Sequence, residues 1–372
     1  MIAVVPWPHP TATRSRSEVD VTRTARARRF SGLVAAVAAA GLLLTACSSS
    51  DDSTADATGS SGDGGFAPVS VQLSWLKNTQ FAGEYVAVED GLYTDAGFEE
   101  VTLTAGGSSA TSAEAAVAGG QALVGLSSPL ITAPAIQAGA EVKIIGATYQ
   151  RNPFALVSAA SAPIEGPDDL AGKTIAVSDS NTLVWNAFLA ANDIDATEVT
   201  TVPLSDTSML TTGQVDGYIG YTTSGASTLV QAGFDAVEFL LADEGLPIVG
   251  EVLVASQADI DERPEELKAF LLATVQGWQA ALDDPERAVS LTVDKYGKDQ
   301  EYDRDAMTLA FDRQAELIAT DDTEANGLLT ITDELQQGTI DSLAFAGIDI
   351  TADELFDLSL LDEVLSENPD VK

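Results

Sequence analysis

The sequence predicts an α/β protein with two lobes, each a mostly parallel sheet covered by helices, around a ligand cleft. Three observations support this fold class. From residue 69 onward, short apolar strands alternate with helix-length segments, which is typical of a parallel sheet. The alternation stops once, at a stretch rich in Ala, Ser, Pro and Gly (158–173), and then resumes. The 372 residues, 45% of them hydrophobic, suffice for two core-bearing domains.

The first lobe is expected to begin with residues 66–157. Its strands are predicted at 69–75, 100–105, 122–127 and 141–149, with helices at 80–91 and 108–120. Gly91 stands where helices commonly end, and serines at 108 and 109 stand where they commonly begin.

The second lobe is expected to span residues 158–246. Its strands are predicted at 174–178, 198–204, 215–221 and 236–241, with helices at 181–192 and 206–213. Residues 247–372 are expected to return to the first lobe and to end in helices. If the second unit is inserted in the first, the two lobes form a cleft between them.

The N-terminal segment, residues 1–46, is typical of an export signal. A cluster of arginines precedes an apolar run (32–46) of about 15 residues, shorter than the roughly 20 that a spanning helix needs. The end of this run, Leu44-Thr45-Ala46-Cys47, resembles the lipobox of bacterial lipoproteins, in which the cysteine is lipidated. We therefore expect lipidation at Cys47, a flexible tether over 47–65 and a location on the extracytoplasmic face of the cell membrane. The alternative is a plain secretory signal with a chance cysteine.

The amino-acid composition excludes several kinds of catalytic and metal-binding site. The one histidine, His9, lies in the signal, and the one cysteine, Cys47, is expected to carry lipid. Beyond residue 46, Ser-His-Asp and Cys-His catalysis, His/Cys zinc sites and disulfides are therefore excluded, and we expect no metal and no cofactor. That part of the chain carries 55 of the 57 acidic residues but only 12 of the 18 basic ones, which argues against binding nucleic acid.

Polar and aromatic side chains gather just after the predicted strands, where ligands of open α/β sheets bind. The indole of Trp75 can stack on a flat ring, and Asn78 and Gln80 can donate and accept hydrogen bonds at its edge. The full set of candidate ligand-binding residues is Trp75, Asn78, Gln80, Phe81, Tyr85, Gly107, Ser108, Ser109, Ser128, Asn181, Tyr221 and Thr222. The alternative is that Trp75 fills the core and that the polar residues only cap helices.

Other candidates have two interpretations each. Gly106–Ser109 resembles a backbone N–H cradle for an anion or an ordinary helix cap. Trp185 is a second stacking face or, preferably, a core residue. Arg151 is the counter-ion of an anionic ligand, or it pairs with a carboxylate at the hinge. Alternation along the strand puts Tyr221 rather than Tyr218 toward the cleft.

Several stretches resemble one family. "LSWLKNTQFAGEYVAVEDGLYTDAGFEEVTLTAGG", "AGGQALVGLSS", "EGPDDLAGKTIAVSDSN" and "GQVDGYIGYTT" are similar to the NMT1/THI5-like (SsuA/THI5-like) substrate-binding proteins of bacterial ABC importers. The resemblance spans about residues 69–290. It implies a periplasmic-binding-protein-like fold of type II, whose lobes close on one small molecule and dock on the permease subunits. We expect such a protein to act as a monomer.

This resemblance indicates the fold and the transport role more clearly than it indicates the ligand. The aromatic set and the scarcity of basic residues favour a pyrimidine precursor of thiamine, hydroxymethyl- or formylamino-pyrimidine. Riboflavin, nitrate, taurine and other sulfonates remain alternatives within the superfamily. Family members that synthesise the thiamine pyrimidine are enzymes that depend on histidine, on a lysine for pyridoxal phosphate and on a cysteine-rich motif. The lack of histidine and cysteine beyond Cys47 excludes that activity. A structural surface lipoprotein is the alternative from another class.

Overall fold

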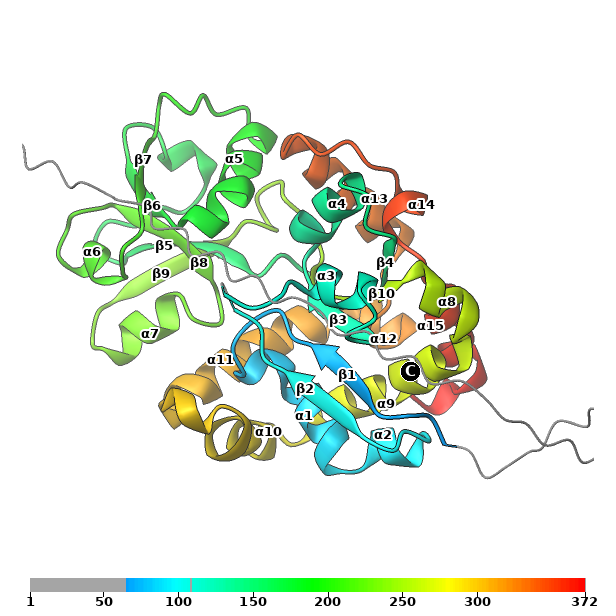
Figure 1. Cartoon of the computed structure of the whole chain (residues 1–372). Coiled ribbons are helices and arrows are strands. Elements are labelled where there is room, and N and C mark those ends of the chain that lie inside the picture. The colour runs from blue at the N-terminus through cyan, green and yellow to red at the C-terminus, as the bar shows by residue number, and fades with distance from the viewer. Residues whose placement is uncertain (1–64, 108, 372) are drawn as a thin grey trace, which may run out of the picture. The chain divides into compact units, whose positions relative to one another are not determined.

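Two five-stranded sheets organise the computed structural model, which describes residues 65–107 and 109–371 (Figure 1). The first sheet, in lobe 1, has the strand order β2-β1-β3-β10-β4, and the second, in lobe 2, has the order β7-β6-β8-β5-β9. The strands of lobe 1 are β1 (Val69–Gln72), β2 (Val101–Thr104), β3 (Val124–Ser127), β4 (Val142–Tyr149) and β10 (Gly250–Ser256). Those of lobe 2 are β5 (Phe154–Ala159), β6 (Thr174–Val177), β7 (Thr200–Pro203), β8 (Gly217–Tyr221) and β9 (Ala236–Leu240).

Each sheet is mixed, because one of its five strands runs against the others. β10 is antiparallel to β3 and β4, and β5 is antiparallel to β8 and β9. These two strands are also the ones on which the chain enters lobe 2 and returns to lobe 1. The sheets change over 150–153 and 241–249, whereas the sequence prediction placed the crossings at 158 and 247.

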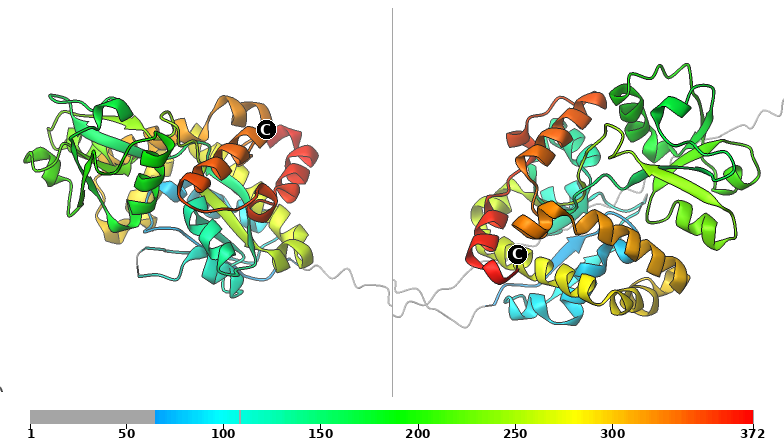
Figure 2. Two further views of the ribbon diagram at one scale, coloured as in Figure 1. Left: turned by 90° about the horizontal axis from the view of Figure 1, so that it is seen from above. Right: turned by 180° about the vertical axis from the view of Figure 1, so that it is seen from behind.

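Helices cover both sheets. Figures 1 and 2 show α5–α7 beside the second sheet, and the first sheet among the remaining helices. Before lobe 2 the chain forms α1 (Ala82–Glu89), α2 (Leu92–Asp95), α3 (Ala113–Ala118) and α4 (Pro129–Gln137). Lobe 2 contains α5 (Thr182–Ala191), α6 (Ser208–Thr211) and α7 (Ala226–Gln231). After β10 follow α8 (Gln257–Glu262), α9 (Pro264–Asp283), α10 (Pro285–Leu291), α11 (Arg304–Ile318), α12 (Asp321–Asn326), α13 (Asp333–Phe345), α14 (Ala352–Leu355) and α15 (Ser359–Glu367). No described helix is both long and apolar enough to cross a bilayer.

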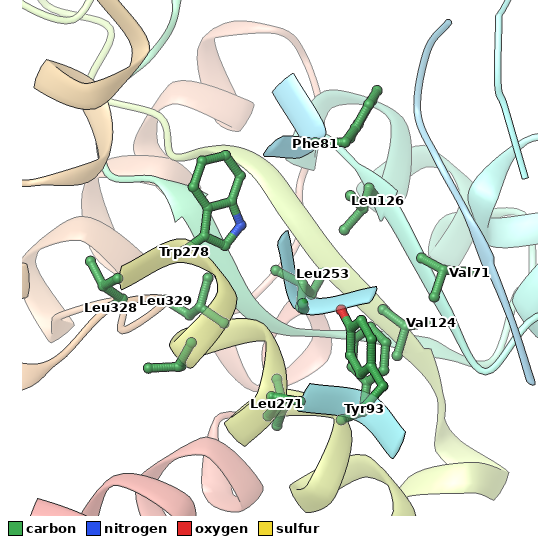
Figure 3. Close-up of a cluster of buried hydrophobic side chains, with 14 of the residues drawn as sticks. Val71, Phe81, Tyr93, Val124, Leu126, Leu253, Leu271, Trp278, Leu328 and Leu329 are labelled. Carbon is green, nitrogen blue, oxygen red and sulfur yellow. The ribbon is translucent and has the colours of Figure 1, made fainter. Parts of the chain in front are cut away.

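The core of lobe 1 lies on both faces of its sheet. Along β10, Leu253 packs into one buried cluster, and its neighbours Val252 and Val254 pack into another, as strand alternation requires. Figure 3 shows Leu253 in the first cluster together with Phe81, Leu126 and Trp278. Both faces of the central strands are therefore buried.

Helices α1 and α9 cross at very short range because both present glycine at the contact. A Cβ atom on Gly83 would lie 2.3 Å from the ring of Trp278, and one on Gly277 would lie 2.4 Å from the Gly83 carbonyl oxygen. Any larger residue would force the helices apart. This contact fixes α1, and with it the segment that leads from β1 into the helix.

Candidate functional site

The segment between β1 and α1 forms a tight polar loop that leaves one aromatic side chain open. Asn78 caps the short 3₁₀ turn Thr79–Phe81: its Oδ1 accepts a hydrogen bond from the Gln80 backbone N–H at 2.8 Å. The Asn78 Nδ2 donates to the Gln80 Oε1 at 3.1 Å. Both predicted ligand-binding amides are thus engaged with each other, whereas the Trp75 side chain stays 46% exposed.

Glu251 is the residue that anchors this loop, and the sequence analysis missed it. It is buried at the start of β10, where its Oε1 accepts from the Ser74 hydroxyl at 2.6 Å and its Oε2 accepts from the Gln80 amide at 2.7 Å. Its φ of 45° is in the left-handed region that glutamate rarely adopts. The available signal was one acidic residue inside the apolar run "PIVGEVLVAS". Glu251 therefore holds the loop on both sides of Trp75.

Two titratable groups at the strand ends, one in each lobe, have raised pKa values. Burial raises the pKa of Glu251 to about 7, although the bonds from Ser74 and Gln80 oppose the shift. Burial, and then the charge of Glu251, raise the pKa of Tyr221 well above its ordinary value. Tyr221 ends β8 in lobe 2, where its ring meets that of Phe154 edge to face at 4.6 Å. The crossing segments 150–153 and 241–249 begin at the ends of β4 and β9, so they join the carboxyl-terminal edges of the two sheets.

The other predicted residues of lobe 2 lie at the same edge. Asn181 follows β6, is half-buried and accepts a hydrogen bond from the Ser180 hydroxyl at 3.3 Å. Ser178 and Ser180 share a hydrogen bond of 3.0 Å. Thr222 is buried, and its hydroxyl donates to the Glu238 carboxylate at 2.5 Å. Asn181 and Tyr221 therefore keep some accessible surface, while the Thr222 side chain is enclosed.

Two of the predicted aromatic contacts are core residues. Phe81 and Tyr85 are both fully buried in the cluster that joins α1 to the first sheet. The Tyr85 ring stacks on Tyr296 with centroids 4.1 Å apart and planes 6° apart. Both side chains face protein rather than solvent, because α1 turns this side toward the sheet and the C-terminal helices. Trp185 likewise lies in the core of lobe 2, where its indole donates to Thr201 at 3.0 Å.

The loop after β2 differs from its prediction. The helix expected at 108 begins at Ala113, where Ser112 caps it, and has six residues. Gly107 and Ser109 therefore precede the helix by several residues and form no helix N-terminus; Ser108 is outside the described residues. Gly106 instead supports the Trp75 loop, since its N–H donates to the Trp75 carbonyl at 2.9 Å. A Cβ on Gly106 would lie 2.2 Å from the Leu73 carbonyl oxygen.

Ser128 lies where it was predicted, directly after β3. It is half-buried at the N-cap of α4, and its side chain makes no capping hydrogen bond. Its backbone carbonyl accepts from Ile131 and Thr132, each at 2.9 Å. The hydroxyl is thus available for another partner.

The cations near the two edges already have partners. Arg151 forms an ion pair with Asp243 in the crossing segments, as one of its two interpretations predicted. Arg313 of α11 lies 4.0 Å from Glu238, and Lys77 lies over the Tyr296 ring at 5.7 Å. The described residues also contain no group of three or more His, Cys, Asp or Glu placed to hold a metal ion. Two of these three cations thus face a carboxylate, and the third faces an aromatic ring.

Two hollows in lobe 1 lie away from these edges. One, of about 530 Å³, is lined by Thr330, Phe356 and Leu361 beside α13–α15. The other, of similar volume, lies beside β4 and α8. We place the candidate site at the strand ends instead, because the exposed indole and the buried carboxyl network converge there.

Comparisons with known proteins agree with this architecture. A sequence model described as "NMT1/THI5 like" matches residues 78–288. The riboflavin-binding protein RibY of Chloroflexus aurantiacus is 28% identical over 273 residues, which cover 68% of this chain and 74% of that protein. The solved structure of the periplasmic aliphatic sulphonate-binding protein SsuA of Escherichia coli has a TM-score of 0.60 at 14% identity, covering 78% of this chain and 92% of that one. The desulfurization enzyme DszB has a TM-score of 0.52 at 17% identity, covering 82% of this chain and all of that one.

Proposed function

The chain belongs to the NMT1/THI5-like family, and we propose that it is the extracytoplasmic solute-binding protein of an ABC importer. The observation that carries this proposal is the open indole of Trp75 on a loop fixed by Glu251, at the edge where the strands of lobe 1 end. Such an arrangement binds a small molecule without moving a proton or forming a bond. Delivery to permease subunits would follow closure of the lobes around the ligand.

The ligand that this site favours is a flat, uncharged heteroaromatic molecule. An indole face contributes about 0.5–1.5 kcal/mol of stacking beyond the area that it buries. Tyr221, Asn181 and Ser128 supply hydroxyl and amide groups for the ring edge. The similarity to a riboflavin-binding relative makes riboflavin the first candidate.

A thiamine-precursor pyrimidine, either hydroxymethyl- or formylamino-pyrimidine, is the second candidate. Trp75, Tyr221 and Asn181 suit a single ring as well as a fused one. Two observations weaken this candidate relative to the sequence prediction: Phe81 and Tyr85 are buried in the core, and Asn78 and Gln80 already have partners. Nitrate and the sulfonates rank lower, because the nearby cations are paired.

A thermal-shift panel tests the ligand. It contains riboflavin, both pyrimidines, taurine, an alkanesulfonate and nitrate. A ligand at about a hundred times its dissociation constant stabilises the fold by roughly 2.7 kcal/mol, which is readily detected. A shift with a sulfonate and none with a flat ring would overturn the assignment.

The Trp75→Ala variant tests the stacking role. We expect it to weaken binding of the ring at least tenfold, because the exposed indole is the face on which the ligand rests. Phe345→Ala is the control, since Phe345 is 44% exposed, like Trp75, but ends α13 and does not follow a strand. Equal affinities of the two variants would move the stacking role to another aromatic residue.

Lobe closure predicts a change in size. Solution scattering should give a smaller radius of gyration with saturating ligand than without it, because the ligand contacts both lobes only in the closed form. The hinge would consist of the crossing segments 150–153 and 241–249. An unchanged radius would exclude closure as the mechanism.

Membrane attachment belongs to the same proposal. Cys47 and the export signal lie outside the described residues, so lipidation rests on the sequence pattern at 44–47. We expect Cys47→Ser to release the protein from the membrane fraction. If the variant stays in the membrane fraction as fully as the wild type, lipidation of Cys47 is not what attaches the protein. A membrane-bound signal or another anchor would then hold it there.

A rival enzymatic function is less well supported. DszB shows that an enzyme can have this fold, but its similarity to this chain concerns the fold alone. The chain has no histidine or cysteine beyond Cys47. A structural surface lipoprotein would not account for an aromatic side chain exposed at a strand end.

A further inference from the structure

Large apolar side chains that are exposed to solvent gather at the strand ends. Seven are exposed among the described residues, and four of them come within a few residues after a strand end: Trp75, Leu76, Ile131 and Leu183. Trp75 and Leu76 follow β1, Ile131 follows β3, and Leu183 follows β6. Leaving them in water forgoes roughly 25 cal/mol for each Å² of apolar surface. Their shared position indicates that something else covers them.

Ile131 lies in lobe 1 and Leu183 in lobe 2, each in the first turn of a helix that follows a strand. Leu130, the neighbour of Ile131 on α4, packs against buried clusters of both lobes. Val184 and Trp185, which follow Leu183 on α5, belong to the cluster of lobe 2. Leu130 of α4 and Val184 and Trp185 of α5 thus share one cluster, and the first turn of each helix, directly beyond the strand ends of its own sheet, leaves one apolar side chain uncovered.

We propose that Ile131 and Leu183 are specificity-determining residues that, with Trp75, select a ligand with an extended, fused apolar ring system. This inference rests on the proposed function. A pyrimidine with amino and hydroxymethyl groups is polar around much of its rim, and apolar side chains there would leave those groups unpaired at a cost. A fused tricyclic ring offers one polar end for Tyr221 and Asn181 and one apolar end for Ile131 and Leu183.

The exposed residues elsewhere supply matched controls. Ile131 is 53% exposed, and Val230 on α7 is 50% exposed; Leu183 is 36% exposed, and Val237 on β9 is 37% exposed. None of these substitutions to serine opens a core cavity. The variants are Ile131→Ser and Leu183→Ser, compared with Val230→Ser and Val237→Ser.

Binding of riboflavin, lumichrome and hydroxymethylpyrimidine to each full-length variant is measured by fluorescence titration and calorimetry. We expect Ile131→Ser and Leu183→Ser each to weaken binding of the fused rings about tenfold, while the controls stay within twofold. Thermal midpoints without ligand should agree among all four variants.

The outcomes separate the inference from the proposed function. If the fused rings bind equally well to all variants, the specificity role is wrong but the solute-binding proposal stands. The same holds if the pyrimidine binds the wild type and the fused rings do not. If no ring in this panel binds the wild type, both are overturned.

Discussion

The two strand-end edges of this molecule are built differently. In lobe 1, buried carboxylates hold the polar groups: Glu251 accepts from Ser74 and Gln80, and Glu114 accepts from Ser127 and Thr132. In lobe 2, the hydroxyls after β6 bond mainly to one another at the surface. Lobe 2 also holds one buried carboxylate, because Glu238 accepts from the Thr222 hydroxyl and the Ala226 N–H. The edge of lobe 1 is thus preorganised, whereas in lobe 2 the segment after β6 is adaptable. We infer that a ligand engages lobe 1 first and that lobe 2 adjusts to it.

The largest expected loss of stability is at Glu251, which anchors the strand-end edge of lobe 1. Glu251→Ala leaves the half-buried hydroxyl of Ser74 and the buried amide of Gln80 without their acceptor, at about 1–3 kcal/mol each. We expect the free energy of unfolding, measured by urea denaturation, to fall by about 2–4 kcal/mol and ligand binding to weaken. Glu301→Ala is the control, because Glu301 is exposed and shares the left-handed backbone, with a φ of 53°. Equal losses in both variants would mean that strain, not the hydrogen bonds, sets the cost.

The same lobe should dominate the pH dependence. Burial raises the pKa of Glu84 to about 8; its Oε1 accepts from the Trp278 indole at 3.3 Å, and its Oε2 has no partner among the described residues. The folded protein keeps this proton over a pH range in which the unfolded chain has lost it. The contribution of Glu84 to stability is therefore fully present below about pH 4.5 and is lost as pH rises toward 8.

The measurement is the urea midpoint at pH 5 and pH 8. Each unit of pKa shift corresponds to about 1.4 kcal/mol, so we expect the wild type to lose at least about 2 kcal/mol over this interval. Glu84→Gln keeps the acceptor for Trp278 but does not titrate, and should lose less. A variant that declines as steeply as the wild type would assign the dependence to other acids.

In lobe 2, removing a hydrogen bond to a buried carboxylate should cost less stability than it does in lobe 1. Thr222→Ala removes the donor to Glu238 but leaves that carboxylate its bond from the Ala226 N–H at 3.2 Å. We expect a loss of about 1 kcal/mol in thermal unfolding. Ser180→Ala, at the exposed edge, should stay within about 0.5 kcal/mol of wild type. A larger loss in Ser180→Ala than in Thr222→Ala would contradict an adaptable edge after β6.

The smallest effect is expected where the lobes share charges. Arg313 of lobe 1 lies 4.0 Å from Glu238 of lobe 2, and the arginine side chain is 42% exposed. The Glu238 side chain is only 8% exposed, but without the arginine it keeps its bonds from the Thr222 hydroxyl and the Ala226 N–H, so we expect the half-exposed arginine to contribute about 0–1 kcal/mol. Arg313→Gln should therefore leave stability nearly unchanged, and any effect should appear in the scattering radius of the ligand-free protein. A loss above about 2 kcal/mol would show that the pair stabilises the fold itself.

Most of the fold could be predicted because its signals are local. Strand and helix periodicities placed β1–β4, β6 and α5 close to their observed ranges, and the return to lobe 1 expected at 247 lies close to the start of β10. The start of α3 was wrong because serines at 108, 109 and 112 are equally good caps, and only Ser112 precedes a packed turn. Phe81 and Tyr85 were assigned to the site because the apolar run at 80–91 does not reveal which face of its helix is buried.

The sequence by itself determined the two-lobed α/β pattern, the loss of histidine and cysteine chemistry, and the position of Trp75 at a strand end. Only the tertiary structure decided what surrounds that tryptophan. Glu251 is separated from Ser74 by 177 positions and from Gln80 by 171, yet bonds to both. Leu130 on α4 likewise packs against buried clusters of both lobes. Neighbours along the chain encode periodicity, whereas partners of a buried polar group are chosen by the way sheets and helices pack in space.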